Sequence, residues 1–231
     1  MRNSLVQARD HPSAVLLAAQ LLAVLAFPFL EGSTGGRAAL GVFQIGIVLA
    51  ALAAVRRTPA LTWVGLLLVP PAMIFTVLEA ISPDSDPIVL GSAVFHAPFY
   101  FFVSYGMIRY LFHDDRVTRD ELFATGAAFT VVAWGFAYVY AAGQVVWPDS
   151  FTGSGGVGER TWFELLFLSF TTLTSVGLSD VTPVAAHARS LVMVEQVAGV
   201  FYIALVVARL MTLSRPRVVQ QPPTDEPEQT P

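Results

Sequence analysis

The chain has 231 residues, of which 55% are hydrophobic and only 13% are charged, and its formal net charge is −4. The apolar residues are gathered in long blocks, and 13 Lys and Arg with 17 Asp and Glu are too few to cover a water-soluble domain of this length. The composition therefore indicates a membrane protein. The near-neutral charge without a basic stripe argues against nucleic-acid binding, and the absence of cysteine excludes disulfides and thiolate metal sites.

Six apolar blocks are long enough to cross a bilayer as helices, which takes roughly 20 residues. The first block follows Arg2 and Arg9 and has no clear small-residue cleavage site, so we interpret it as a membrane span and not as a removed signal. Charged or turn-forming residues separate the first five blocks. The predicted spans are Ser13–Leu30, Ala38–Val55, Leu61–Ile81, Ile88–Phe112, Leu122–Val146 and His187–Leu213.

The distribution of arginine predicts the orientation of these spans. Arginines gather at alternate span ends, and six crossings place those ends on the cytoplasmic side of a cell membrane, with both termini. Residues 1–12 form a short cytoplasmic tail in this prediction. The Pro-, Gln- and Glu-rich residues 214–231 form a disordered one with no soluble regulatory domain. The arginine pairs are Arg2 with Arg9, Arg56 with Arg57, Arg116 with Arg119, and Arg215 with Arg217, while Arg37, Arg160 and Arg189 are exceptions.

The connection between the fifth and sixth predicted spans is long, from Trp147 to Ala186. It opens with a glycine-rich stretch over residues 152–158 and becomes apolar again from Thr161 to Leu173. A helix over this second part would reach only about two-thirds of the way through a hydrocarbon core of ~30 Å. We therefore predict a re-entrant helix that enters and leaves on one side, which requires protein or a water-filled cavity around its end.

The segment from Thr171 to Asp180 follows this short helix and is rich in hydroxyl groups around Gly177. An extended strand at membrane depth presents backbone carbonyls, and rings of carbonyls from several chains can replace the hydration shell of a cation. The hydroxyl of Ser175 can add one more oxygen layer, and the carboxyl end of the preceding helix favours a cation. The pattern thus predicts a cation pathway, and the alternative is a polar loop between two membrane helices.

The run Thr-Thr-Leu-Thr-Ser-Val-Gly-Leu-Ser-Asp resembles the potassium channel signature Thr-x-x-Thr-x-Val-Gly-Tyr-Gly-Asp, and Val181-Thr182-Pro183 continues it. The last span is similar to the inner helix of bacterial members of the ion-channel superfamily. The resemblance implies an all-α membrane protein, with six transmembrane helices and a re-entrant pore helix and filter loop between helices five and six. It also implies a homotetramer in the membrane lipid that conducts K⁺ passively, with no cofactor and no enzymatic activity.

The resemblance assigns roles to individual residues. The filter is expected at Thr174, Ser175, Val176, Gly177, Leu178, Ser179 and Asp180, with K⁺ held by Thr174 to Gly177, and the pore helix contributes Trp162, Phe163, Glu164, Thr171 and Thr172. Leu178 replaces an aromatic that braces the filter in the family. Ser179 replaces a glycine whose left-handed or related backbone would cost a serine about 1–2 kcal/mol. We expect the outermost ion site to be rebuilt or missing, and a weakly selective monovalent cation channel remains a second interpretation.

Two residues of the last span have open interpretations. Gly199 lies where the family often has a hinge glycine, and the alternative is close helix packing at a small residue. Glu195 lies one helical turn earlier and is the only acid deep in that span, so it should face protein or water. We expect it behind the filter, where it either braces the pore helix or tunes the occupancy of the filter.

The remaining residues divide into a peripheral domain, 13–120, and a pore domain, 121–213. The fourth span carries Arg109 as its only arginine or lysine, whereas steep voltage gating needs several charges per subunit, so strong voltage dependence is not expected. His96 in the same span is interpreted as a core residue. A small membrane carrier or enzyme is the remote alternative, because no acid–base pair, nucleophile arrangement or inverted repeat supports it.

Overall fold

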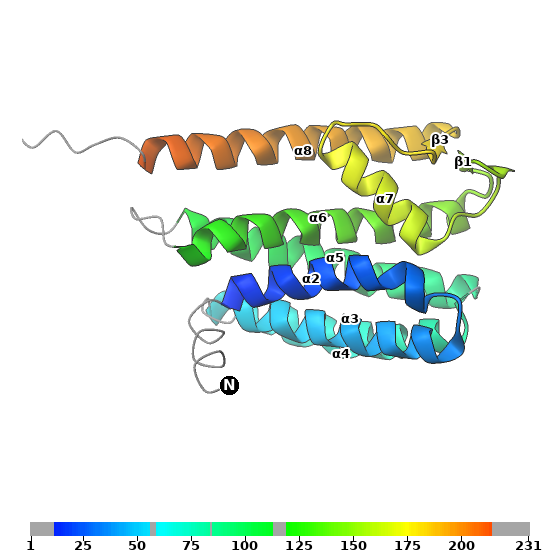
Figure 1. The fold of residues 1–231 in the computed structure, drawn as a ribbon, viewed down its shortest axis with the longest axis horizontal. Coiled ribbons are helices and arrows are strands. Elements are labelled where there is room, and N and C mark those ends of the chain that lie inside the picture. Colours follow the sequence, from blue (N-terminus) through cyan, green and yellow to red (C-terminus); the bar gives the residue numbers. More distant parts are fainter. Residues whose placement is uncertain (1–11, 56–58, 84, 113–118, 214–231) are drawn as a thin grey trace, which may run out of the picture.

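The structure is a computed structural model that describes residues 12–55, 59–83, 85–112 and 119–213. Long helices lie side by side, and one short helix slants between the last two of them (Figure 1). The helices are α2 (Pro12–Leu30), α3 (Thr34–Val55), α4 (Pro59–Ile81), α5 (Asp86–Leu111), α6 (Arg119–Val146), α7 (Trp162–Leu173) and α8 (Ala186–Leu213). The predicted tails lie outside the described residues, except for Pro12.

Every predicted apolar block coincides with a helix, and the ends differ by about one turn or less. In the part of the chain that the structure describes, five helices are long and apolar enough to cross a membrane. They cover Ser13–Leu30, Trp63–Ile81, Asp86–Arg109, Asp120–Val146 and Ala186–Arg209. The chain is therefore a multi-pass membrane protein. The apolar part of α3, Gly35–Ala50, is shorter, so the second predicted span stays a prediction.

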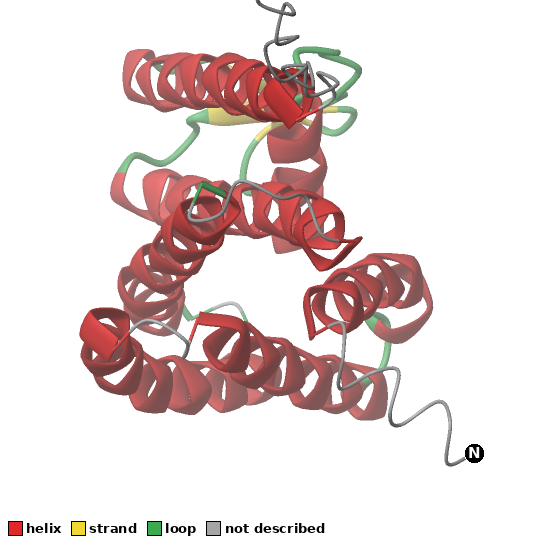
Figure 2. Ribbon diagram, turned by 90° about the vertical axis from the view of Figure 1, so that its left-hand side faces the viewer, coloured by secondary structure: helices red, strands yellow, loops and turns green. Residues whose placement is uncertain are grey.

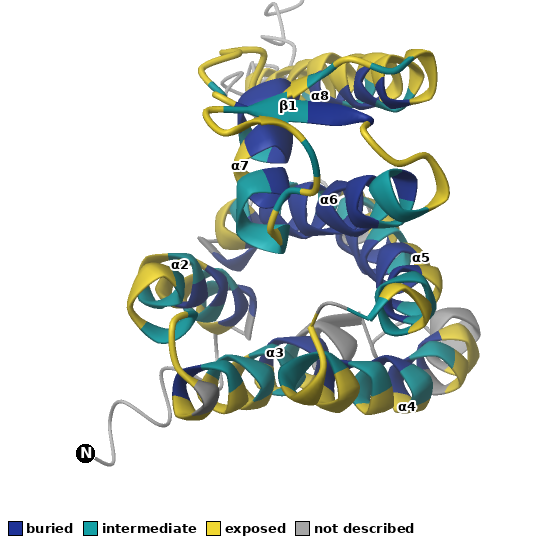
Figure 3. Ribbon diagram, turned by 90° about the vertical axis from the view of Figure 1, so that its right-hand side faces the viewer, coloured by how far each residue is buried: buried dark blue, intermediate teal, exposed yellow. Residues whose placement is uncertain are grey.

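Helices α2 to α6 form a ring in which each packs on the next and α6 closes on α2 (Figures 2 and 3). Helices α7 and α8 lie on the other side of α6 (Figure 3). Helix α6 is therefore central, with 61% of its span buried against 17% for α8. Its buried face is rich in alanine, including Ala127, Ala133 and Ala137, and such small side chains let neighbouring helices approach closely.

His96 lies fully buried among the helices of this ring. Its Nε2 lies 3.0 Å from Thr76 Oγ1, its Nδ1 lies 2.9 Å from Ser92 Oγ, and its ring stacks on Tyr138 at 4.6 Å between centroids. Both ring nitrogens therefore have protein partners on neighbouring turns of α4 and α5. This geometry agrees with the interpretation of His96 as a core residue.

A small antiparallel sheet covers one end of the bundle and was not predicted. Its strands are β1 (Phe151–Gly153), β2 (Gly156–Val157) and β3 (Thr182–Pro183), in the order β2-β1-β3. In the register, Phe151 lies opposite Pro183 and Thr152 lies opposite Thr182. The chain segment between β1 and β3, which includes α7, therefore leaves and returns at the same end of the bundle (Figure 1).

Candidate ion pathway

The short helix α7 begins with a capping box. The N–H of Glu164 donates to Thr161 Oγ1 at 3.3 Å, and the N–H of Thr161 donates to Glu164 Oε2 at 2.7 Å. Two of the free N–H groups at this helix end are thus satisfied, and the acid lies at the positive end of the helix dipole. On the apolar face, Leu165 and Leu168 are buried in a cluster with residues of α6 and α8, and Leu166 is also buried.

Arg160 is wrapped by the glycine-rich hairpin just before α7. Its Nε donates to Gly158 O at 3.1 Å and its Nη2 donates to Gly156 O at 2.9 Å. A Cβ built on Gly153 would lie 2.5 Å from Nη1, so the guanidinium fits because this position has no side chain. The backbone N–H and C=O of Arg160 also bond the side chain of Gln144, both at 2.9 Å. These contacts give the glycine-rich stretch a structural role and tie it to α6.

Replacing Arg160 by alanine is expected to loosen this hairpin, because hydrogen bonds from a charged donor contribute about 1.5–3 kcal/mol each. Hydrogen–deuterium exchange of peptides covering residues 150–160 should become faster in Arg160→Ala. The matched control is Arg189→Ala, since the exposed Arg189 makes one side-chain hydrogen bond, to Pro183 O at 3.3 Å. Unchanged exchange in Arg160→Ala would show that the guanidinium does not hold the hairpin.

A second carboxylate lies near the start of α7. Glu31 follows α2 and is partly buried, and this burial raises its pKa. The charge of Glu164 raises the pKa of Glu31 further. The turn after α2 therefore meets the amino end of α7 at the end of the bundle that carries the sheet (Figure 1).

Three consecutive backbone N–H groups after α7 turn back to the end of that helix. They are Ser175 N–H to Thr172 O at 2.9 Å, and Val176 N–H and Gly177 N–H to Thr171 O, each at 3.0 Å. No described peptide bond is cis, and a trans peptide points its N–H and its C=O in opposite directions. The carbonyls of Thr174, Ser175 and Val176 consequently all point away from α7, which gives three successive oxygens on one side of the chain.

The backbone of this turn alternates in handedness. Ser175 has a φ of 59° and Gly177 has a φ of 68°, whereas Val176 between them does not have a positive φ. Glycine adopts such a conformation without steric cost, while a residue with a Cβ pays about 1–2 kcal/mol. Gly177 is therefore the residue type that this backbone favours, and Ser175 carries strain that the sequence did not predict.

Ser179 does not adopt the left-handed backbone that the resemblance implies for the glycine at this position. Among the described non-glycine residues, only Asp149 and Ser175 have a positive φ. Ser179 Oγ instead accepts the N–H of Val181 at 3.1 Å, which holds the return of the chain toward β3. The serine thus serves a turn that glycine could not stabilise in this way, because glycine has no side-chain acceptor.

The side chains of the turn differ in their packing. Thr171 and Thr172 are buried, and Thr174 Oγ1 donates to Phe170 O at 2.7 Å at the end of α7. Val176 and Leu178 are 59% and 76% exposed. Asp180 is exposed at the start of the return segment. The chain's own residues therefore leave two large apolar side chains of the predicted filter uncovered.

Glu195, on α8, is fully buried. Its carboxylate accepts hydrogen bonds from the hydroxyls of Tyr140 on α6 and Ser169 on α7. Ser169 Oγ also lies 2.9 Å from Ala133 O. One side chain of α8 therefore joins the two helices beside it. The partners Tyr140 and Ser169 were not predicted. The sequence does place a hydroxyl side chain on each of the two neighbouring helices, and this could have indicated hydrogen-bond donors for Glu195.

Gly199 packs against the last residue of α7. A Cβ on Gly199 would lie 2.2 Å from Leu173 O and 2.9 Å from Leu173 C, far inside contact distance. The backbone of α8 therefore touches the backbone of α7 where the predicted filter begins. This contact supports the close-packing alternative for Gly199 and identifies its partner.

Residues 126–215 match the family model described as Ion channel. The matched range contains most of α6 and all of α7 and α8. The turn at residues 174–177, Glu195 and Gly199 therefore fall within it. No curated protein and no solved structure matches the chain. The chain is thus a multi-pass membrane protein that is similar to ion channels over the part that contains the candidate pathway.

Proposed function

We propose that this chain is one subunit of a homotetrameric, potassium-type channel that conducts K⁺ passively along the carbonyls of Thr174 to Gly177. The observation that carries the proposal is the set of three consecutive N–H groups that turn to α7 and leave three carbonyls on the opposite side. Such carbonyls replace the water around a cation without binding it too tightly to release it. K⁺ is the transported ion here and not a resident cofactor.

The position of α7 favours a cation at these oxygens. The helix has 12 residues and starts at the end of the bundle that carries the sheet, and its carboxyl end lies well inside the bundle (Figure 1). A helix carboxyl end carries a partial negative charge, which attracts cations. The peptide oxygens and the helix dipole therefore act on the ion in the same direction.

A ring of oxygens needs several copies of the chain, because each chain contributes one such segment. Val176 and Leu178 are uncovered in the single chain, and α8 has exposed apolar residues along its length, including Val194, Val197 and Phe201. Neighbouring subunits would cover the first two side chains and part of α8, with lipid on the remainder. Four copies close the ring in this proposal, as in the family that the sequence resembles.

A weakly selective monovalent cation channel with the same architecture is the second candidate. The observation that favours it is the backbone at Ser179, which lacks a positive φ and is bonded to the return of the chain. The alternation of positive and negative φ therefore ends at Gly177. If Ser179 also had a positive φ, the alternation would continue and could align further carbonyls. Fewer oxygen layers would give weaker discrimination between K⁺ and Na⁺.

Reversal potentials distinguish the two candidates. The purified protein is reconstituted in liposomes or planar bilayers with K⁺ on one side and Na⁺ on the other. Current that reverses far from zero, toward the K⁺ equilibrium potential, is expected for the first candidate. Reversal near zero would replace it by the second, and absence of any ion flux would contradict both and favour a carrier or an enzyme.

Gly177→Ala is expected to abolish or strongly reduce the current while the protein still assembles. No heavy atom lies within 4 Å of a Cβ at Gly177, so the effect comes from the φ of 68°. The strain is about 1–2 kcal/mol per subunit, or about 4–8 kcal/mol in four copies. Gly46→Ala is the matched control, since Gly46 also has free space and lies inside α3. Equal currents in both variants would contradict the assigned pathway.

A further inference from the structure

Glu79 is the one charged residue of the apolar span Trp63–Ile81 in α4. It lies two residues, or about 3 Å, before the last residue of α4 and is only partly buried, so water at that end of the helix can reach it. Among the described residues, Glu79 makes no ion pair. A carboxylate without a counter-charge in a membrane span is costly, and such groups commonly mark a functional site.

Ser92 on α5 forms a side-chain hydrogen bond with Glu79 and is fully buried. Nδ1 of His96 lies 2.9 Å from Ser92 Oγ and 3.0 Å from the carbonyl oxygen of Ser92. Because a carbonyl oxygen can only accept, Nδ1 carries a hydrogen and donates it. In the neutral ring, Nε2 then accepts the hydroxyl of Thr76 at 3.0 Å. Both nitrogens of His96 are thus satisfied without a charge, and the hydroxyl hydrogen of Ser92 is left for another partner.

The hydroxyl of Ser92 has two oxygens within reach of its single hydrogen. One belongs to the carboxyl group of Glu79, and the other is the hydroxyl oxygen of Tyr138 on α6. When Glu79 is ionised, Ser92 donates to the carboxylate, which stabilises the charge. When Glu79 holds a proton, its own O–H donates to Ser92 Oγ, and the hydrogen of Ser92 turns to Tyr138. Both protonation states of Glu79 therefore leave Ser92 with a donor and an acceptor.

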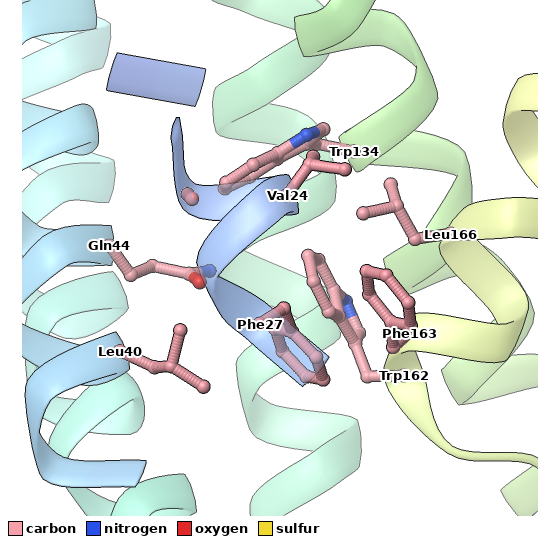
Figure 4. Close-up of a pocket in the computed structure, with 9 residues that line it drawn as sticks. Val24, Phe27, Leu40, Gln44, Trp134, Trp162, Phe163 and Leu166 are labelled. Carbon is pink, nitrogen blue, oxygen red and sulfur yellow. The ribbon is translucent and has the colours of Figure 1, made fainter. Parts of the chain in front are cut away.

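Tyr138 is held in place from the other side of the ring. Its hydroxyl oxygen accepts the side-chain N–H of Gln44 on α3, and its aromatic ring stacks on His96 at 4.6 Å between centroids. Gln44 reaches inward from α3 and lines a small cavity of about 20 Å³, which has room for one water molecule (Figure 4). The oxygen of Tyr138 is therefore fixed in position as an acceptor for Ser92.

The charged groups on the helices that pack against α4 do not neutralise Glu79. Arg37, on α3, makes no ion pair with Glu79, and Asp86 is exposed at the start of α5. Tyr100 and Tyr138 lie within electrostatic reach of Glu79, and phenol groups are uncharged at neutral pH. A proton is therefore the partner that removes the charge of Glu79.

We propose that Glu79 binds and releases one proton inside the membrane, at the contact between α4 and α5, and that the hydrogen of Ser92 then moves between Glu79 and Tyr138. The proton arrives from the end of the bundle that carries the sheet, where α4 ends and α5 begins (Figure 1). Tyr138 and Tyr140 are two residues apart and face opposite sides of α6, and Tyr140 bonds Glu195 on α8. The site thus links the pH on one side of the membrane to the central helix. This inference goes beyond the proposed function and does not depend on conduction.

Infrared difference spectroscopy of the assembled, reconstituted protein tests this site. A protonated carboxyl group has a C=O stretching band that an ionised carboxylate lacks. At about pH 6, where exposed carboxyl groups are already ionised, we expect such a band in the wild type and its loss as the pH is raised. Glu79→Gln should lack the band. Glu195→Gln is the matched control and should keep it, since Glu195 is another buried acid in a membrane span.

The proposal would be overturned if Glu79→Gln removed no such band, because Glu79 would then be ionised throughout. A Glu79 band that persisted in alkaline buffer would also overturn it, because the proton would then never be released.

Two further variants keep the carboxyl group and should move the midpoint of the band's loss in opposite directions. Ser92→Ala removes the donor that stabilises the ionised form, so the midpoint should rise by about one pH unit. Tyr138→Phe removes the second acceptor, so Ser92 donates to Glu79 alone and the midpoint should fall. Any other combination of shifts would overturn the exchange of the Ser92 hydrogen between Glu79 and Tyr138.

Discussion

Glu195→Ala is expected to abolish ion flux and to destabilise the protein, because Glu195 is the shared acceptor of two buried hydroxyls. Tyr140 would lose its hydrogen-bond partner in a buried site, at a cost of about 1–3 kcal/mol, whereas Ser169 would keep Ala133 O as an acceptor. The missing carboxylate also leaves a cavity between α6, α7 and α8, which adds to the loss. Since the turn after α7 is bonded to the end of that helix, a displacement of α7 would misplace the proposed ion pathway.

Glu195→Gln separates the hydrogen bonds of this side chain from its charge. Ser169 has one hydroxyl hydrogen and two acceptors in reach, Glu195 and Ala133 O. An amide at position 195 can donate to Ser169 Oγ, which frees that hydroxyl hydrogen for Ala133 O, and its oxygen can still accept from Tyr140. We therefore expect Glu195→Gln to retain most of the stability and flux.

Thermal unfolding of the reconstituted protein and K⁺ flux are the two measurements for this pair of variants. Gln196→Ala is the matched control, since Gln196 is the next residue of α8 and is exposed. Tyr140→Phe removes one of the two hydroxyls, and its effect should be much smaller in the Glu195→Ala background than in the wild type. If Glu195→Ala behaved like Gln196→Ala, Glu195 would not stabilise the contact between α6, α7 and α8. If Glu195→Gln were as impaired as Glu195→Ala, the charge of Glu195 would be required.

Gly199→Ala is expected to have the second large effect, because the new Cβ would lie 2.2 Å from the carbonyl oxygen of Leu173. Neither atom is at the end of a flexible side chain, so α8 and α7 would have to move apart. Overpacking of this kind costs about 1–3 kcal/mol or more per site. Loss of current together with a lower unfolding temperature is the expected result.

The double variant Ala198→Gly with Gly199→Ala distinguishes close packing from a hinge. It keeps one glycine in the middle of α8, which restores a hinge, but the clash with Leu173 remains. We expect the double variant to be as impaired as Gly199→Ala alone. Recovery of current in the double variant would contradict the packing interpretation. Gly143→Ala serves as the control, since its Cβ would meet only the flexible end of Leu191, at 3.2 Å.

The helices could be predicted from the sequence because the bilayer imposes a simple rule. A spanning segment must be long and apolar and must satisfy its backbone hydrogen bonds internally, so each block of apolar residues coincided with a helix. The short helix before the hydroxyl-rich turn followed from the same argument, and its capping residues Thr161 and Glu164 lie three positions apart in the sequence. Local information was sufficient for these elements.

The sheet and the backbone of the turn depended on contacts between distant parts of the chain. Strands of two or three residues have no recognisable sequence pattern. Strand β1 pairs with β3, which follows α7 in the sequence, and Arg160 bonds the carbonyls of Gly156 and Gly158 in the adjoining hairpin. The positive φ of Ser175 lies in the turn whose N–H groups bond the carbonyls of Thr171 and Thr172, and Ser179 has no positive φ. The resemblance in sequence did not indicate this backbone at Ser175.

By itself, the sequence therefore determined that this is a multi-pass membrane protein, where its helices lie, and which segment bears the resemblance to a channel filter. Only the tertiary structure decided that Glu195 joins Tyr140 and Ser169, and that Gly199 meets Leu173. The reason is physical. Helix formation in lipid follows from the hydrogen bonds and hydropathy of neighbouring residues, whereas these contacts depend on how α8 is rotated and how deeply it packs against α6 and α7.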